Sequence, residues 1–292
     1  MFSSPAPLVL GGRRFDASRP AVMGIINRNS DSFYTAARYA DTTAAVERAK
    51  QMIDEGVDII DIGGVRAGQE GEWVSGTEEI QRVLPVLEAL RELPVLTSVD
   101  TWRTEVAQAC AGLVDLINDT WAGADADLVH VAAETGAGYV ISHTGGLPPR
   151  TDPTSVDYGP GDAVVEHVLD GLQAGAGRAE EAGLPRERIL IDPTLDFGKT
   201  TVNSLALVAN THRIVALGYP VLQAISRKDF VGETLDLPTD ERLEGTLAAT
   251  AISAWQGATV FRAHDVRATR RVLDMVASIR GDRAPVRADR GR

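Results

Sequence analysis

Short apolar segments alternate with helical patterns about eight times along this chain, and no other feature constrains the fold as strongly. Each apolar segment is almost continuously apolar, as in a strand that is covered on both faces. Strands that alternate with helices in this way predict an α/β fold with a parallel sheet, and eight such units predict a (β/α)8 TIM barrel. The predicted strands are residues 21–26, 57–62, 95–99, 113–117, 138–141, 189–191, 221–225 and 258–261.

The length of 292 residues fits a single barrel with a short segment before it and a tail after it. Residues 1–20 contain a Gly11-Gly12 turn between short apolar runs, which predicts a β-hairpin that closes the bottom of the barrel. We expect the barrel over residues 21–281. The polar residues 282–292 are rich in arginine and are expected to be disordered.

Composition and charge exclude several classes of protein. The net charge of −12 and the isoelectric point near 4.9 argue against binding to nucleic acid or to anionic membranes. No apolar run approaches the roughly 18 to 20 residues of a membrane span, and the chain starts without a signal-peptide pattern. The single cysteine, Cys110, fits a reducing cytoplasm. The five histidines do not stand at zinc-ligand spacing.

Polar side chains follow every predicted strand. The carboxyl ends of barrel strands meet on one face, where barrel enzymes place their active sites. For Asp61, Asp119 or His143 taken alone, capping of the next helix is an equally good explanation. The joint occurrence favours one functional site. In chain order the residues are Asn27, Asp61, Asp100, Asn118, Asp119, His143, Asp192, Ser226, Lys228, Arg262 and His264.

These polar residues fall into two chemical groups. Asp100, Asn118 and Asp192 offer acceptors and a carboxamide, which suit a planar heterocycle with several N–H donors. Arg262, His264 and Asn27 suit an oxyanion, with Mg²⁺ bridging Asn27 and a diphosphate. Lys228 directly follows a strand and is expected to be buried against a charged partner.

Nearly the whole chain, from residue 21 to 279, resembles the dihydropteroate synthases, which join a pterin diphosphate to p-aminobenzoate. The order of the motifs on successive strand ends makes the resemblance specific. The motifs are Met23-Gly24-Ile25-Ile26-Asn27, Asp61-Ile62-Gly63-Gly64, Ser98-Val99-Asp100-Thr101, Ile117-Asn118-Asp119, Asp192-Pro193 with Phe197-Gly198-Lys199, Ser226-Arg227-Lys228 and Arg262-Ala263-His264-Asp265.

The resemblance implies a cytoplasmic, homodimeric transferase that uses Mg²⁺ and binds a pterin diphosphate and an aryl amine. It assigns the pterin to Asp100, Asn118, Asp192, Phe197 and Lys228. It assigns the diphosphate to Asn27, Arg262 and His264, with Asn27 also holding the metal. The implied amine site contains Phe33, Arg66 and Ser226, and the implied catalytic residues are Lys228, Arg262 and His264.

Two loops depart from the family pattern. The first usually reads Asn-x-Thr-Pro-Asp-Ser-Phe-Ser-Asp-Gly-Gly, whereas here Asn29, Ser30, Ala36 and Ala37 replace the Thr, the Pro and the two glycines. The second usually reads Gly-Gly-Glu-Ser-Thr-Arg-Pro-Gly, and residues 65–70 here lack its Ser-Thr-Arg. Because proline fixes φ and glycine permits positive φ, the closed geometry of the first loop should differ.

Asp196 adds an acidic group beside the predicted pocket, either solvated or directed inward toward a cationic amine.

The sequence leaves two functional hypotheses. In one, the protein condenses a dihydropterin methyl diphosphate with p-aminobenzoate or another amine, with low or altered activity. In the other, it is a catalytically degenerate paralogue that binds pterins or partners. Methyltetrahydrofolate-binding methyltransferases share the barrel, but Ser226-Arg227-Lys228 and Arg262-Ala263-His264 favour the synthase branch.

Overall fold

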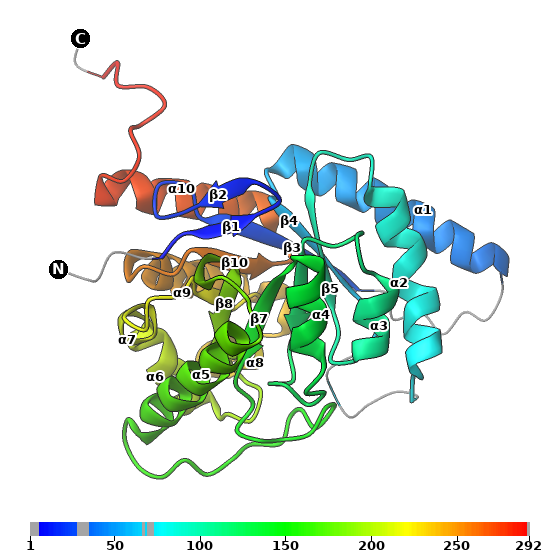
Figure 1. Ribbon diagram of the computed structural model, residues 1–292. Helices are drawn as coiled ribbons and strands as arrows, with labels where there is room; N and C mark the ends of the chain where they lie inside the picture. The colour runs from blue at the N-terminus through cyan, green and yellow to red at the C-terminus, as the bar shows by residue number, and fades with distance from the viewer. Residues whose placement is uncertain (1–5, 28–34, 66–67, 69–72, 291–292) are drawn as a thin grey trace.

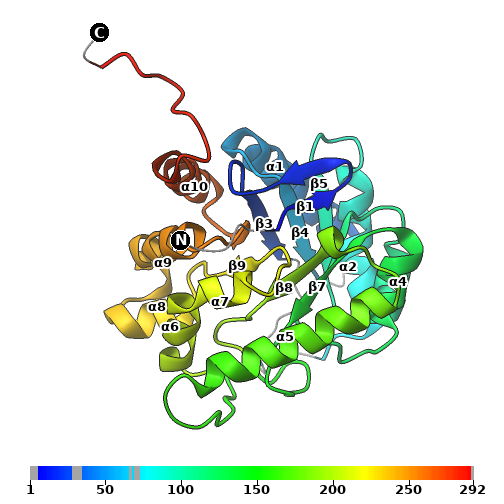
Figure 2. The ribbon, with the colours of Figure 1, turned by 60° about the vertical axis from the view of Figure 1, so that its left-hand side comes forward.

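Eight parallel strands form a nearly closed barrel with the helices outside it (Figures 1 and 2). The computed structural model describes residues 6–27, 35–65, 68 and 73–290. Neighbouring strands follow the order β8-β7-β6-β5-β4-β3-β10-β9, and a parallel bridge between Ile191 and Val221 joins the two ends of this order. The predicted TIM barrel and N-terminal hairpin are confirmed.

The strands begin and end close to the predicted positions. The largest difference is at β6, which begins three residues later and ends two residues later than predicted. The hairpin strands are β1 (Leu8–Leu10) and β2 (Arg13–Phe15). The barrel strands are β3 (Ala21–Asn27), β4 (Ile59–Gly63), β5 (Leu96–Asp100), β6 (Leu116–Asp119), β7 (Gly138–Ser142), β8 (Ile189–Asp192), β9 (Leu222–Ala224) and β10 (Val260–Ala263).

The helices follow the predicted alternation with two additions. We expected no separate α7 (Thr211–Val215) or α8 (Asp229–Leu235). The first helix, α1 (Thr35–Glu55), begins earlier than the Thr43 predicted from its N-cap pattern. The others are α2 (Gly76–Leu90), α3 (Thr104–Ala109), α4 (Leu128–Thr135), α5 (Ala163–Glu181), α6 (Thr201–Ala209), α9 (Leu243–Trp255) and α10 (Val266–Arg280).

The hydrophobic core has two parts. The larger part lies between the sheet and the helices. The smaller part fills the barrel, where each strand contributes an inward-facing apolar residue such as Ile59 or Val260. Leu8, Leu10 and Phe15 of the hairpin belong to this inner cluster. The hairpin therefore closes the bottom of the barrel and leaves its carboxyl-terminal end for the site.

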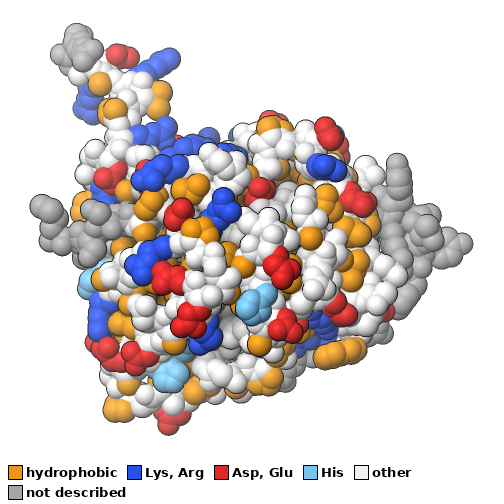
Figure 3. All heavy atoms as spheres, in the orientation of Figure 1, with side chains coloured by type: hydrophobic (Ala, Val, Ile, Leu, Met, Phe, Trp, Pro, Cys, Tyr) orange, Lys and Arg blue, Asp and Glu red, His pale blue; other side chains and the backbone are white. Residues whose placement is uncertain are grey.

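A buried carboxylate ties the hairpin to the barrel. Asp58 is fully buried and accepts hydrogen bonds from Arg13, Arg19 and the backbone N–H of Val22. Arg270 of α10 pairs with the same carboxylate at 3.4 Å. Basic side chains are accordingly dense on the surface near the hairpin and α10 (Figure 3). Because three cations compensate one buried charge, this end of the molecule is held together electrostatically.

No helix in the described ranges is long and apolar enough to cross a membrane. Residues 282–290 contain no helix or strand and extend away from α10 (Figure 1). Disorder of this tail remains a prediction.

We predict that the hairpin contributes strongly to stability through Phe15, whose side chain is 1% exposed in the inner cluster. Phe15→Ala should lower the free energy of unfolding by about 3–5 kcal/mol in urea denaturation, because it removes buried area and leaves a cavity. Val9→Ala, on the other face of the same hairpin, is the control and should lower it by less than about 1 kcal/mol. Equal losses would show that the hairpin does not pack as a plug.

Candidate functional site

A polar layer lies directly above the apolar interior of the barrel. Side chains two residues apart on a strand share a face, so the residue two positions after each inner core residue also points inward. On β4, Asp61 follows Ile59 in this way, and on β10 Arg262 follows Val260. We define the polar layer as Asp61, Ser98, Asn118, Ser142, Asp192 and Arg262.

Arg262 lies between two carboxylates from neighbouring strands. Its Nε donates to Asp61 Oδ2 at 2.7 Å, and its Nη2 donates to Asp100 Oδ2 at 2.8 Å. Burial disfavours the charged guanidinium, but Asp61 and Asp100 hold the pKa of Arg262 above its usual value. Burial also raises the pKa of Asp100 to about 6, with Arg262 opposing and Asp61 adding to the rise. The three groups carry a net negative charge when all are ionised.

Asn118 extends this cluster across the next strand. Its Nδ2 donates to Asp61 Oδ2 at 3.1 Å, while Thr120 donates to Asp100 Oδ1 at 2.7 Å. Strand register places Asn27, Gly63, Asp100 and Asn118 in one row across β3 to β6. Asp61 Oδ1 is buried and accepts no hydrogen bond from the described residues. The cluster therefore retains an acceptor for a ligand.

Lys228 and Asp192 stand on the opposite side of the barrel mouth. Lys228 Nζ donates to the carbonyl of Leu195 and lies 4.7 Å from the centre of the Phe197 ring. Burial lowers the pKa of Lys228, which Asp196 and Asp192 oppose. Burial raises the pKa of Asp192, which Lys228 opposes. Lys228 is half-buried, and Asp196 and Asp192 are the carboxylates that favour its charged form.

A cavity of about 260 Å³ brings most of the predicted site residues together. The Ser226 hydroxyl forms two hydrogen bonds with His264. It accepts from the backbone N–H of His264 at 3.1 Å, and it lies 3.1 Å from His264 Nδ1. Partial burial and the nearby Arg262 lower the pKa of His264, so the ring is neutral at pH 7. The predicted residues that line the cavity are Asn27, Phe197, Ser226, Lys228, Arg262 and His264.

Other residues of the sequence motifs serve the fold. Arg227 is among the residues that line the cavity, but its guanidinium forms a two-point ion pair with Asp265 at 2.9 and 3.0 Å. Lys199 is buried and donates to the carbonyls of His143, Thr194 and Phe197 at 2.6, 3.0 and 2.8 Å. Burial lowers the pKa of Lys199 to about 7. Lys199 therefore fixes the loop that presents Phe197.

For Asp119, Asp196 and His143, the sequence allowed either a supporting role or a place in the site, and the structure shows where each side chain lies. Asp119 caps its own turn by accepting from the backbone of Trp121 and Gly123. Asp196 accepts from the backbone N–H of Asp229 at 2.8 Å, which caps α8 and explains why this helix forms. His143 faces α5, outside the barrel. Asp119 and His143 are thus not part of the cavity, and Asp196 lines it with its carboxylate already engaged.

Two acidic residues at the site were not predicted as ligands. Asp61 was weighed as a cap, and only its pairing with Arg262, 201 positions away, reveals its role. Asp152 lies in a loop after β7 where no strand end signals it, yet it lines the cavity. Burial raises the pKa of Asp152, and Lys228 opposes the rise. Of the predicted amine site, Ser226 lines the cavity, while Phe33 and Arg66 lie outside the described residues.

Comparison with known proteins identifies the family of this chain. Residues 23–264 match the pterin binding enzyme family. The chain belongs to that family. It is 50% identical to "Inactive dihydropteroate synthase 2" of Mycobacterium leprae over 97% of this chain and 98% of that protein. It is 42% identical to "Dihydropteroate synthase" of Staphylococcus epidermidis over 84% of this chain and 89% of that protein.

Comparison with solved structures also places the chain beside dihydropteroate synthases. A dihydropteroate synthase of Coxiella burnetii in complex with pteroic acid superposes with a TM-score of 0.82 and 32% identity, covering 95% of this chain and 99% of that one. The resemblance to dihydropteroate synthases is therefore confirmed. One of these relatives is named dihydropteroate synthase and the other inactive dihydropteroate synthase 2, which agrees with both functional hypotheses.

We predict that Arg262 stabilises the family member chiefly by neutralising Asp61, which is fully buried. Arg262→Leu should lower the free energy of unfolding at pH 7.5 by about 3–5 kcal/mol, because it leaves a buried carboxylate unpaired. Without the guanidinium, which opposes the rise, the folded-state pKa of Asp100 rises further above its unfolded value. The folded variant then binds more protons than the unfolded chain, so the loss should shrink as the pH falls from 7.5 toward 5.

The control for this measurement is Arg186→Leu, which breaks the surface pair with Glu180 and should cost less than about 1 kcal/mol. Urea denaturation at several pH values measures both variants. A deficit in Arg262→Leu that is independent of pH would contradict the electrostatic explanation.

Proposed function

We propose that this protein binds a dihydropterin methyl diphosphate at the mouth of the barrel and condenses it with p-aminobenzoate slowly or not at all. The observation that carries the proposal is the polar layer with its adjoining Asp100 and Lys228, which offers converging acceptors beside the two cations Arg262 and Lys228. The Coxiella relative holds pteroic acid, in which a pterin is joined to p-aminobenzoate.

The pterin would lie against Asp100, Asn118, Asp192, Phe197 and Lys228. A pterin presents amide and amino N–H donors along one edge, and carboxylates and a carboxamide oxygen accept them. Asp61 Oδ1 and Asp192 add buried acceptor capacity, which is expensive to leave unfilled. This acceptor excess favours a ligand rich in N–H groups over a carboxylate or a sugar.

The diphosphate is assigned to Asn27, Arg262 and His264, with Lys228, Arg262 and His264 as the catalytic groups. Arg262 already donates to two carboxylates, and its Nη1 is the nitrogen without a partner among the described residues. His264 is neutral at pH 7 because its pKa is lowered. The chain therefore offers a diphosphate little net positive charge, which makes a metal ion necessary.

Mg²⁺ fits this site through Asn27. No cluster of three or more His, Cys, Asp or Glu residues in the described ranges could hold a metal by itself. Mg²⁺ commonly binds through one or two protein oxygens together with substrate phosphates, and Asn27 lines the cavity beside His264. When bound, the ion would add positive charge at the leaving diphosphate. Asn27 would orient the diphosphate, Arg262 Nη1 and His264 would donate to its oxygens, and no covalent bond to the protein is required.

Low turnover with p-aminobenzoate follows from the two altered loops. Groups that the family uses to close over the amine are replaced at positions 29, 30, 65, 67 and 68. The amine site assigned to Phe33, Arg66 and Ser226 therefore lacks the usual surroundings. The name of the Mycobacterium leprae relative, "Inactive dihydropteroate synthase 2", supports the second hypothesis, a paralogue that binds pterins without turnover.

A homodimer is supported by one apolar surface. Helices α6, α8, α9 and α10 pack side by side. Each exposes large apolar side chains, which together mark an interface rather than isolated surface residues. Exposed fractions include 73% for Val202, 51% for Ile252 and 61% for Met275. The proposed cytoplasmic location rests on the cysteine count, because Cys110 is the single cysteine and the chain can form no internal disulfide.

The pterin site is tested first by direct binding. Asp192→Ala should weaken the binding of a dihydropterin methyl diphosphate by more than about 1 kcal/mol, because pterin donors then face no acceptor. Isothermal titration measures the affinity, and Asp170→Ala on the exposed surface of α5 serves as the matched control. The absence of binding heat with folded wild-type protein would overturn the proposed function.

The metal assignment predicts that Mg²⁺ raises affinity for the diphosphate ligand. Asn27→Ala should abolish this enhancement while leaving binding of the hydroxymethyl pterin, which has no phosphates, unchanged. Titrations with and without Mg²⁺ decide the matter. If the variant keeps its Mg²⁺ dependence, Asn27 is not the ligand.

Turnover with p-aminobenzoate should be at least about tenfold below that of an active dihydropteroate synthase assayed alongside, since loss of one transition-state hydrogen bond alone can cost about a hundredfold. The measurement is pyrophosphate release with and without p-aminobenzoate. Grafting the family loop sequences onto residues 29–37 and 65–70 should raise the rate. Ordinary turnover by the unaltered protein would contradict the prediction, and an inactive graft would place the defect in the polar layer.

A further inference from the structure

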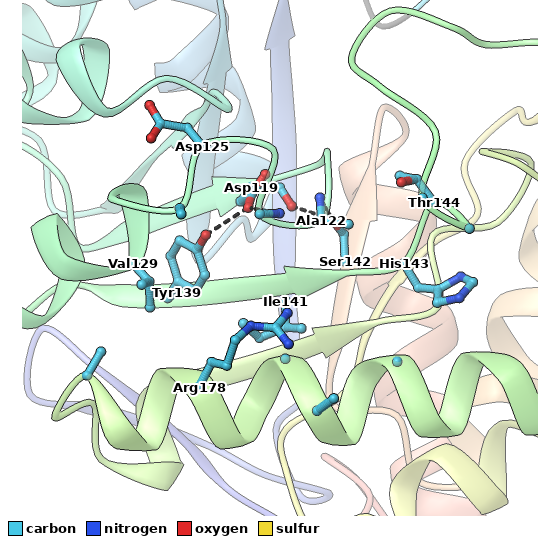
Figure 4. A pocket seen from close by; sticks show the side chains of 18 of the residues that line it. Asp119, Ala122, Asp125, Val129, Tyr139, Ile141, Ser142, His143, Thr144 and Arg178 are labelled. Carbon is cyan, nitrogen blue, oxygen red and sulfur yellow. Dashed lines mark hydrogen bonds between the residues drawn. The ribbon is translucent and has the colours of Figure 1, made fainter.

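A second cavity lies outside the barrel, between α4, α5 and the outer face of β7 (Figure 4). Its volume is about 580 Å³, within the range of small-molecule sites in proteins. Val129 and Ile141 supply apolar walls, and Arg178 and His143 lie along its length. This cavity shares no lining residue with the cavity at the barrel mouth.

Two glycines of α5 bring the helix close to β7. A Cβ at Gly171 would lie 2.7 Å from His143 Cδ2, and a Cβ at Gly175 would lie 2.5 Å from Ile141 Cγ2. The same Gly175 position is 3.7 Å from Arg178 Nη2. Arg178 is therefore folded back along α5 over the cavity, one helical turn from the imidazole of His143.

His143 lies at one end of the cavity, and one of its ring nitrogens has no hydrogen-bond partner among the described residues. The residue is 6% exposed, and its Nε2 lies 3.0 Å from His167 Nδ1. Its Nδ1 is buried and has no hydrogen-bond partner in the described part of the chain. Burial, with Lys199 and His167 adding to the effect, lowers the pKa of His143 to about 3, so this ring is neutral. A neutral imidazole nitrogen accepts or donates one hydrogen bond according to its tautomer.

Arg178 is the only Lys or Arg among the described residues that line the cavity. It is exposed, and no ion pair or hydrogen bond joins its guanidinium to another described residue. The acidic lining residues are Asp119, Asp125 and Glu181. Asp119 is occupied by Tyr139 and two backbone donors, and Asp125 accepts from Thr104 and Asp127. Glu181 lies on the same helix as Arg178 without pairing with it. The guanidinium is thus available to an anion that enters the cavity.

We propose that this cavity is a binding site for a planar aryl carboxylate. Its carboxylate would pair with Arg178, its ring would lie on Val129 and Ile141, and a polar substituent on the far side of the ring would reach His143 Nδ1. Gly171 and Gly175 are one turn apart, about 6 Å along α5, which is the span of a single para-substituted ring. A phenolic hydroxyl satisfies either tautomer of the imidazole because it both donates and accepts.

Methyl NMR titration with 4-hydroxybenzoate tests the site. Saturable shifts of the Val129 and Ile141 methyl groups are expected. Arg178→Gln should weaken the affinity at these methyl groups at least fivefold, and so should replacing the probe by uncharged 4-hydroxybenzyl alcohol. Ala174→Leu, which fills the cavity from the exposed side of α5, should abolish the shifts. Arg267→Gln on the exposed face of α10 is the matched control and should leave them unchanged.

Thermal unfolding of each variant checks that the fold is retained. The proposal is overturned if Val129 and Ile141 do not respond up to the solubility limit of the probe. It is equally overturned if the Arg178→Gln variant binds 4-hydroxybenzoate as tightly as the wild-type protein does. The same holds if the wild-type protein binds 4-hydroxybenzyl alcohol as tightly as 4-hydroxybenzoate. Shifts of these methyl groups with protein concentration alone would assign the cavity to a second copy of the chain instead. None of these outcomes depends on pterin binding at the barrel mouth.

Discussion

The sharing of one guanidinium by two buried carboxylates organises the upper half of this barrel. Arg262 joins β10 to β4 through Asp61 and to β5 through Asp100, at 2.7 and 2.8 Å. Burial of any one of these charges alone would cost several kcal/mol. The attraction between the guanidinium and the two carboxylates offsets this desolvation cost. Asn118 and Thr120 complete the hydrogen bonding from β6 and the turn after it. The result is a rigid acceptor surface formed before any ligand arrives.

The same electrostatics limits what the site can bind. Asp61 and Asp100 together outweigh Arg262, Lys228 is drawn toward Phe197 and the Leu195 carbonyl, and His264 is neutral. A heterocycle with several N–H donors matches this charge distribution, whereas a free diphosphate does not. The proposed dependence on Mg²⁺ follows from that mismatch and from the overall charge of −12.

In the proposed function, binding and turnover depend on different parts of the site. Residues that would hold the pterin lie on strands or directly after them, where the barrel fixes their positions. Residues that would close over the amine lie in two loops whose sequences depart from the family. Loss of loop groups leaves the polar layer intact, because its contacts run from strand to strand. On the proposed function, the pterin site is retained while catalysis is lost, and the relatives include one named dihydropteroate synthase and one named inactive dihydropteroate synthase 2.

The sequence by itself determined the barrel, the hairpin and the row of polar strand ends, because short continuous apolar runs and helical patterns are local and alternate about eight times. It predicted the convergence of Asn27, Ser226, Lys228, Arg262 and His264, because the carboxyl ends of parallel strands share one face. Only the tertiary structure decided which polar residues line the cavity and which support the fold. Asp196 caps α8, His143 faces α5, and Asp61 pairs with Arg262 across 201 positions. Those choices depend on partners distant in sequence, and a local pattern carries no record of them.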